Sequence, residues 1–142
     1  RKDNKSIMCG IAGTYNFSSE DLTRRMAQSL KHRGPDEQGF SSFNRGSFGF
    51  RRLSIIDLEN GSQPMNSEDG SVTVIFNGEI YNYKELRTKL ISSGHKPYTN
   101  TDTEVIVHLY EEYGEKCLDF LRGMFSFALW DAKKKKLFVC YR

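Results

Sequence analysis

Apolar residues recur at helical spacing in three stretches of the chain, which predicts three amphipathic helices. The first is expected between Ser19 and Gly34, with acidic residues in its first turn, where they complement the helix dipole. The apolar face of this helix consists of Leu22, Met26, Ala27 and Leu30. The second helix is expected to follow Asn82 and to stop at Gly94.

A third helix is expected to begin at Thr101, because Glu104 three residues later completes the pattern of a capping box. The helical pattern continues through VIVHLYEEYG. His108 lies in this stretch, and we expect its side chain on the helix surface. A short helical turn is expected from Cys117 to Leu121.

Six other stretches are typical of β-strands, because they are rich in aromatic and β-branched residues or alternate in polarity. They cover residues 11–17, 38–43, 47–56, 71–76, 124–131 and 137–142. Every second residue from Phe125 to Leu129 is large and apolar, which predicts one strongly apolar strand face. The basic run from Lys133 to Lys136 separates the last two strands, where we expect a solvated hairpin turn. Such hairpins favour an α+β fold of packed antiparallel sheets over a doubly wound parallel sheet.

The composition argues against nucleic-acid-binding, membrane-spanning, disulfide-rich and zinc-binding classes of protein. The 142 residues fit one globular domain, and a formal net charge of +3 is too small to indicate nucleic-acid binding. No stretch reaches the roughly 18 apolar residues of a membrane span, so no membrane partner is expected. The three cysteines match neither a disulfide framework nor a zinc site, so we expect a cytoplasmic chain without a metal site.

Cys9, in the apolar segment MCGIAG, is the candidate nucleophile. None of the three histidines follows a spacing that favours it as the base for this thiol. A free α-amine on Cys9 itself, with an unperturbed pKa of about 8, would supply the base from the same residue. The alternative is that Cys9 is a small core residue, which is the commoner fate of a cysteine in an apolar run.

Other polar positions supply complementary groups. The side-chain amide of Asn77 and the backbone N–H of Gly78 are a candidate oxyanion hole, although Asn-Gly is also usual in a strand-to-helix turn. Arg52, within an apolar strand, is a candidate ligand for a substrate carboxylate, with a surface position as the alternative. Asp102, in the first turn of the third predicted helix, is a candidate ligand for a substrate ammonium. The alternative is that its carboxylate only stabilises the positive end of the helix dipole. Together these groups suit hydrolysis of the side-chain amide of an α-amino acid.

Six segments resemble, in order and spacing, the glutaminase domain of glutamine-hydrolysing asparagine synthetase, a class II glutamine amidotransferase and N-terminal-nucleophile hydrolase. They are MCGIAG, HRGPDEQG, RLSIIDLENGSQPM, NGEIYNYKELR, TDTEVI and LRGMFSFALWD. The resemblance runs from Met8 to Arg142 and implies a four-layer αββα sandwich of two antiparallel sheets. It also implies that Cys9 is the catalytic residue and that Asn77 and Gly78 form the oxyanion hole.

The resemblance further implies how glutamine, the substrate, is bound. Arg52 would bind its carboxylate, while Asp102 and backbone groups of Glu79 would hold its α-amine. The other implied contacts are Leu53, Ser54, Ile55, Ile56, Asn77 and Gly78. Residues 32–36 match a loop near the site, for which we expect a structural role. No cofactor is implied for this domain, whereas ATP and magnesium are implied for a C-terminal synthetase domain that makes asparagine.

Residues 1–8 precede the nucleophile, and residues 9–142 form the expected amidotransferase type-2 domain. We expect residues 1–8 to be a cloning remnant, with a removable propeptide and a non-catalytic glutamine-binding homologue as the alternatives. While the Met8–Cys9 peptide bond is intact, the nitrogen of Cys9 is an amide that cannot act as a base, so the chain is expected to be inactive. The apolar run at residues 137–142 suggests a domain truncated at its C-terminal end. Homodimer formation is left open.

Overall fold

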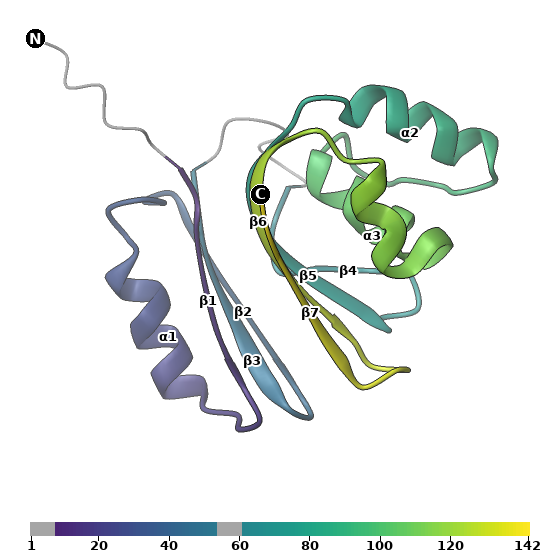
Figure 1. Cartoon of the computed structure of the whole chain (residues 1–142). Coiled ribbons are helices and arrows are strands. Elements are labelled where there is room, and N and C mark those ends of the chain that lie inside the picture. The colour runs from purple at the N-terminus through teal and green to yellow at the C-terminus, as the bar shows by residue number, and fades with distance from the viewer. Residues whose placement is uncertain (1–7, 54–60) are drawn as a thin grey trace, which may run out of the picture.

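Two antiparallel sheets lie face to face in the part of the chain that the computed structural model describes, residues 8–53 and 61–142 (Figure 1). The first has the strand order β1-β3-β2. Its strands are β1 (Gly10–Tyr15), β2 (Glu37–Phe43) and β3 (Gly46–Arg52). The second has the order β4-β5-β6-β7. Its strands are β4 (Met65–Asn66), β5 (Val72–Ile80), β6 (Gly123–Asp131) and β7 (Lys136–Tyr141).

Helices cover the outer face of each sheet (Figure 1). Helix α1 (Glu20–Ser29) lies on the first sheet, and α2 (Tyr83–Ser92) and α3 (Asp102–Tyr113) lie on the second. A 3₁₀ segment, η1 (Gly114–Asp119), follows α3 directly. This arrangement confirms the predicted α+β fold and its four αββα layers. Among the described residues, no helix is both long and apolar enough to cross a membrane.

The core has two parts, because the second sheet is apolar on both faces. From Phe125 to Leu129, every second residue of β6 faces α3 and is at most 3% exposed, which confirms the predicted apolar face. The opposite face of the sheet joins an inter-sheet core, which we define as Phe48, Phe50, Ile75 and Trp130. Strand β6 therefore contributes to both parts of the core.

Helix α1 contacts the first sheet through small side chains. Thr23 and Ala27 are completely buried, and an added Cβ at Gly49 of β3 would lie only 3.0 Å from the Cβ of Ala27. The hydroxyl oxygen of Thr23 lies 2.6 Å from Oγ of Ser47, which satisfies the polar atoms of both buried side chains. The predicted apolar face is therefore displaced by one position, since Leu22, Met26 and Leu30 are only partly buried.

The predicted starts of the three helices are confirmed, but not all of the predicted capping hydrogen bonds are present among the described residues. Ser19 caps α1 by accepting a hydrogen bond from the backbone of Leu22 at 3.3 Å, although α1 ends at Ser29, earlier than expected. Thr101 caps α3, yet the Glu104 carboxylate turns away from Thr101 and binds the preceding loop, so the capping box is incomplete. Asn82 precedes α2 without a side-chain cap.

Two other predictions are wrong. Strand β5 continues to Ile80 instead of ending at Phe76, because Asn77 and Gly78 remain paired with β6. His108 is 3% exposed, because the α2–α3 connection lies over it and the Glu104 carboxylate lies within hydrogen-bond distance of its Nε2. Strand β3 ends at Arg52, and the part of its predicted range at residues 54–56 lies outside the described residues. The hairpin turn between β6 and β7 is confirmed.

Phe127→Ala is expected to lower the free energy of unfolding by about 3–5 kcal/mol, because it leaves a cavity between β6 and the helices. Val139→Ala on β7 is the matched control, since Val139 is 64% exposed and its truncation should change stability by less than about 1 kcal/mol. Urea unfolding followed by circular dichroism measures both. Equal effects of the two substitutions would contradict the assignment of Phe127 to the core.

Candidate functional site

A cavity of about 360 Å³ is lined by residues from both sheets and from the start of α3. The lining includes every described residue of the predicted site, which are Cys9, Arg52, Leu53, Asn77, Gly78, Glu79 and Asp102. Ser54, Ile55 and Ile56 lie outside the described residues. Cys9 and Asp102, which lie 93 positions apart in the sequence, therefore contribute to one cavity.

Strand pairing places Cys9 at the edge of this cavity. Because Gly10 lies opposite Arg51 in the β1–β3 pair, Cys9 lies beside the end of β3. The backbone N–H of Leu53 donates to Sγ of Cys9 at 3.4 Å. Burial raises the pKa of the Cys9 thiol, while the Leu53 N–H and the nearby Arg52 guanidinium act in the opposite direction. The protonated thiol is therefore the main form at neutral pH, and a base is needed to activate it.

Arg52 places a positive charge in the cavity wall. It is only 4% exposed, which excludes the surface alternative. Its Nη1 lies 3.1 Å from Oε2 of Glu37, a carboxylate whose side chain is 39% exposed. The guanidinium presents several N–H donors in one plane, a geometry that matches the two oxygens of a carboxylate. The position thus suits a carboxylate ligand.

The loop at residues 32–36 supports the end of β3. Arg51 donates from Nε to the carbonyl oxygen of Gly34 at 2.8 Å and from Nη2 to that of Pro35 at 3.2 Å. A Cβ at Gly34 would lie 2.5 Å from the Arg51 backbone, so only glycine allows this approach. Arg33 also donates to the carbonyl oxygen of Cys9 at 3.4 Å. These contacts agree with a structural role for the loop.

Asn77 and Gly78 lie within β5, on the second sheet. Oδ1 of Asn77 is buried and has no hydrogen-bond partner among residues 8–53 and 61–142. A buried polar atom of this kind is rare, and a ligand in the cavity would satisfy the amide. Gly78 has a φ of 135°, and a Cβ there would lie 2.3 Å from the carbonyl oxygen of Met124. Only glycine therefore fits at this position.

Asp102 contributes a carboxylate to the cavity lining from the first turn of α3. Its Oδ2 accepts a hydrogen bond from the backbone N–H of Ile80 at 3.1 Å. The residue is 8% exposed. Burial raises the pKa of this carboxyl, and the nearby Glu79 raises it further, against the N–H groups that lower it. A cation bound beside Asp102 would relieve this unfavourable burial of charge.

Gln63 and Met8 are among the lining residues that were not identified as site residues from the sequence. Gln63 joins β5 to α3, because its Oε1 accepts from the backbone of Phe76 at 2.6 Å and its Nε2 donates to Oγ1 of Thr103 at 3.2 Å. Nothing in the sequence distinguishes such a buried amide from a surface glutamine. Met8 is half-buried and also lines the cavity, so the residue before Cys9 takes up part of the wall.

Comparison with known proteins identifies relatives over nearly the whole chain. The family model described as "Glutamine amidotransferase domain" matches residues 8–141. The chain is 48% identical over 139 residues to asparagine synthetase [glutamine-hydrolyzing] 2 of Bacillus subtilis (strain 168), covering 93% of this chain and 18% of that protein. It is 44% identical over 133 residues to asparagine synthetase [glutamine-hydrolyzing] 2 of Oryza sativa subsp. japonica, covering 90% and 22%. The chain thus spans about a fifth of the length of these curated relatives.

A solved structure supports the fold. The glutamine phosphoribosylpyrophosphate amidotransferase from B. subtilis, solved with ADP and GMP, superposes with a TM-score of 0.71. The match covers 88% of this chain and 35% of that protein, at 22% sequence identity. At this identity the comparison supports only the shared architecture of the two sheets and their helices.

Asp102→Asn is expected to raise the free energy of unfolding at neutral pH. Because burial raises the folded-state pKa of Asp102, folding favours the protonated acid. That stabilisation is complete below the unfolded-state pKa and is lost as the pH rises through the folded-state pKa. Asparagine cannot ionise, yet its Oδ1 still accepts from Ile80, so the advantage of the variant should shrink as the solution is acidified.

Thermal unfolding from acidic to neutral pH measures this difference. Asp69→Asn is the matched control, because hydrogen bonds from Lys133 and Ser71 lower the pKa of the exposed Asp69 carboxyl. That substitution should not stabilise the protein at neutral pH. A less stable Asp102→Asn variant at neutral pH would contradict the proposed burial of an unfavourable charge.

Proposed function

Because this chain belongs to the family of glutamine amidotransferase domains, we propose that it hydrolyses the side-chain amide of L-glutamine, giving glutamate and ammonia. One observation carries the proposal: the groups of Cys9, Arg52, Asn77 and Asp102 meet in one cavity. Glutamine carries a carboxylate, an ammonium and an amide carbonyl. The cavity offers a cation, an anion and a thiol with an adjacent amide, so each substrate group has a complementary partner.

The two charged residues orient the substrate in this proposal. The Arg52 guanidinium binds the α-carboxylate, and the Asp102 carboxylate binds the α-ammonium with the backbone of Glu79. Both protein charges are buried, so their interactions with substrate are screened by little water. Recognition at this end leaves the side-chain amide to extend toward Cys9.

The reaction begins with attack of the Cys9 sulfur on the amide carbonyl carbon. The thiol proton passes to the α-amine of Cys9, and the carbonyl oxygen becomes an oxyanion that the Asn77 amide and the Gly78 N–H stabilise. Collapse of this intermediate breaks the C–N bond, and the amine of Cys9 returns the proton to the departing ammonia. A thioester remains on the sulfur. Water then attacks the thioester, and the products are glutamate and the free thiol.

The chemistry requires cleavage of the Met8–Cys9 peptide bond. An amide nitrogen cannot accept the thiol proton, whereas a free α-amine has a pKa of about 8. Cleavage also removes Met8 from the cavity wall, where it limits the space beside the nucleophile. Cleavage of the Met8–Cys9 bond therefore provides both the basic α-amine and the space for substrate beside Cys9.

The ammonia is proposed to serve a second domain. The relatives are named asparagine synthetases, and this chain corresponds to about a fifth of their length. A synthetase domain in the same parent chain would use ATP and magnesium to activate aspartate as the acceptor. In this proposal no step at Cys9 involves either of them.

Protein that begins at Cys9, as verified by intact mass, is expected to release one glutamate and one ammonia per glutamine consumed. Protein that retains residues 1–8 should be inactive, because its Cys9 has no basic nitrogen. Cys9→Ala in the cleaved protein should abolish turnover. Cys140→Ala is the control, since Cys140 does not line the cavity and its loss should leave the rate unchanged.

Folded protein verified to begin at Cys9 that binds glutamine without releasing glutamate would overturn the enzymatic function. That result would instead indicate a glutamine-binding domain. Full activity with residues 1–8 attached would contradict the role of the α-amine, because another group would have to accept the proton.

Asn77→Ala in the cleaved protein is expected to lower kcat by about 10²–10³-fold, the usual effect of losing one oxyanion donor. KM should change much less, because Asn77 acts mainly on the intermediate. Asn66→Ala is the matched control, since Asn66 on β4 accepts a hydrogen bond from the Thr73 hydroxyl on β5 and does not line the cavity. Steady-state kinetics of both variants measure the effect. A rise in KM as large as the fall in kcat would argue against this role.

A further inference from the structure

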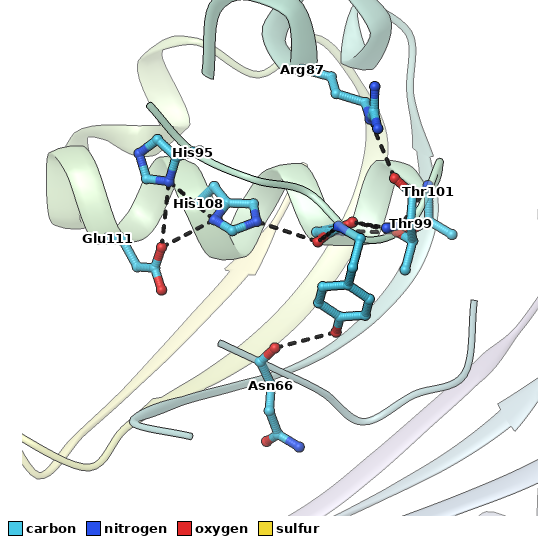
Figure 2. A network of polar contacts seen from close by, with 9 residues as sticks. Asn66, Arg87, His95, Thr99, Thr101, His108 and Glu111 are labelled. Atoms are coloured by element: carbon cyan, nitrogen blue, oxygen red, sulfur yellow. Dashed lines mark hydrogen bonds and ion pairs between the residues drawn. The ribbon is translucent and has the colours of Figure 1, made fainter. Parts of the chain in front are cut away.

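Two histidines and a glutamate converge on one point where the α2–α3 connection crosses α3 (Figure 2). Nδ1 of His95, in the connection, lies 3.2 Å from Nδ1 of His108, on α3. Oε2 of Glu111, one turn further along α3, lies 3.1 Å from Nδ1 of His108 and 3.7 Å from Nδ1 of His95. None of the three lines the glutamine cavity.

The outer ring nitrogens of both histidines are held by other carboxylates. Nε2 of His108 lies 3.3 Å from Oε1 of Glu104, which is 2% exposed. Nε2 of His95 lies 2.5 Å from Oε2 of Glu112. A carboxylate accepts hydrogen bonds and cannot donate them when ionised, so each Nε2 carries the proton. Both Nδ1 atoms are then acceptors in the neutral rings.

Three acceptors therefore face one another, a repulsive arrangement without a cation between them. A proton on Nδ1 of His108 would lie between two acceptors, Nδ1 of His95 and Oε2 of Glu111, and would leave those two atoms facing each other at 3.7 Å. A metal ion at the centre would accept a lone pair from all three atoms. The arrangement thus favours a metal ion over a shared proton.

The distances match those of a zinc site. Zn²⁺ binds imidazole nitrogen and carboxylate oxygen at about 2.0–2.2 Å, which separates neighbouring ligands of a tetrahedron by about 3.3 Å. The three observed separations are 3.1, 3.2 and 3.7 Å. Small rotations of the Glu111 side chain at the protein surface would equalise them, and water would take the fourth position.

We propose that His95, His108 and Glu111 bind one divalent transition metal ion, with Zn²⁺ as the best match. Two imidazoles and one carboxylate suit Zn²⁺, Ni²⁺ or Cu²⁺ better than the oxygen-preferring Mg²⁺ and Ca²⁺. Glu104 and Glu112 are the outer partners that orient the two rings, an arrangement usual around metal-bound histidines.

The metal would fix the α2–α3 connection to α3 at a second point. Glu104 already binds the other end of this connection, through the backbone N–H groups of Tyr98 and Thr99. With His95 bound through the metal, both ends of the segment from His95 to Thr99 are held by the same helix. This segment leads into Asp102, so its rigidity would stabilise the start of α3.

Calorimetric titration of the full chain with Zn²⁺ tests the proposal, and one bound ion per chain is expected. His95→Gln and Glu111→Gln should each weaken binding by about 100-fold or more, and Glu112→Ala, which removes an outer partner, by about 10–100-fold. All three side chains lie at or near the surface, so the variants should fold. His32→Gln is the matched control, because His32 is exposed and contacts only the Ser29 carbonyl among the described residues.

Titration with Co²⁺ identifies the ligands by absorption. A site of nitrogen and oxygen donors should give visible d–d bands of four-coordinate Co²⁺ without thiolate-to-cobalt charge transfer. Zn²⁺ should also raise the midpoint of thermal unfolding of the wild type but not of His95→Gln.

Three results would overturn the proposal. One is the absence of Zn²⁺ and Co²⁺ binding, which would mean that a proton alone satisfies the cluster. Another is binding that both His95→Gln and Glu111→Gln leave unchanged. The third is a thiolate charge-transfer band, which would assign the ion to a cysteine.

Discussion

The packing of the two sheets against each other determines where every group of the candidate site lies. Cys9 and Arg52 belong to the first sheet and its flank, whereas Asn77 belongs to the second. Their separation depends on the inter-sheet core, whose aromatic and aliphatic side chains fill the space between the layers. Where polar side chains replace this core, at the end of β3, the sheets enclose a cavity instead. The cavity and the inter-sheet core thus occupy different parts of the same interface between the two sheets.

Burial gives the cavity its chemical character and also reduces its stability. The same loss of water that raises the pKa of Cys9 and Asp102 would strengthen the attraction of Arg52 and Asp102 for any ligand of opposite charge. Glu37 moderates this effect at Arg52, since its carboxylate partly neutralises the guanidinium. The buried charged groups of the cavity therefore favour ligand binding but lower the free energy of unfolding.

Periodicity in the sequence was sufficient for most helices and strands and for the antiparallel α+β class, because these patterns are dictated locally, whereas the four layers followed from the family resemblance. Periodicity failed where tertiary contacts decide. Asn77 and Gly78 have turn propensity, yet pairing with β6 keeps them in a strand. The burial of His108 depends on a connection that crosses α3 from elsewhere in the chain, which local spacing does not reveal. For the same reason neither the buried amide of Gln63, although it lies in a family segment, nor the His95 cluster was predicted, whereas the ordered family motifs identified Cys9, Arg52, Asn77 and Asp102.

The shared position of strand β6 between the two parts of the core affects how the protein unfolds. Because its two faces contribute to different parts of the core, loss of either part removes support from the strand that the other needs. The helical layer and the first sheet are therefore linked in one cooperative transition, with no stable intermediate that keeps half of the sandwich. Backbone amides of the central β5–β6 pair should then exchange with solvent only through global unfolding, and exchange at the helix ends should be faster.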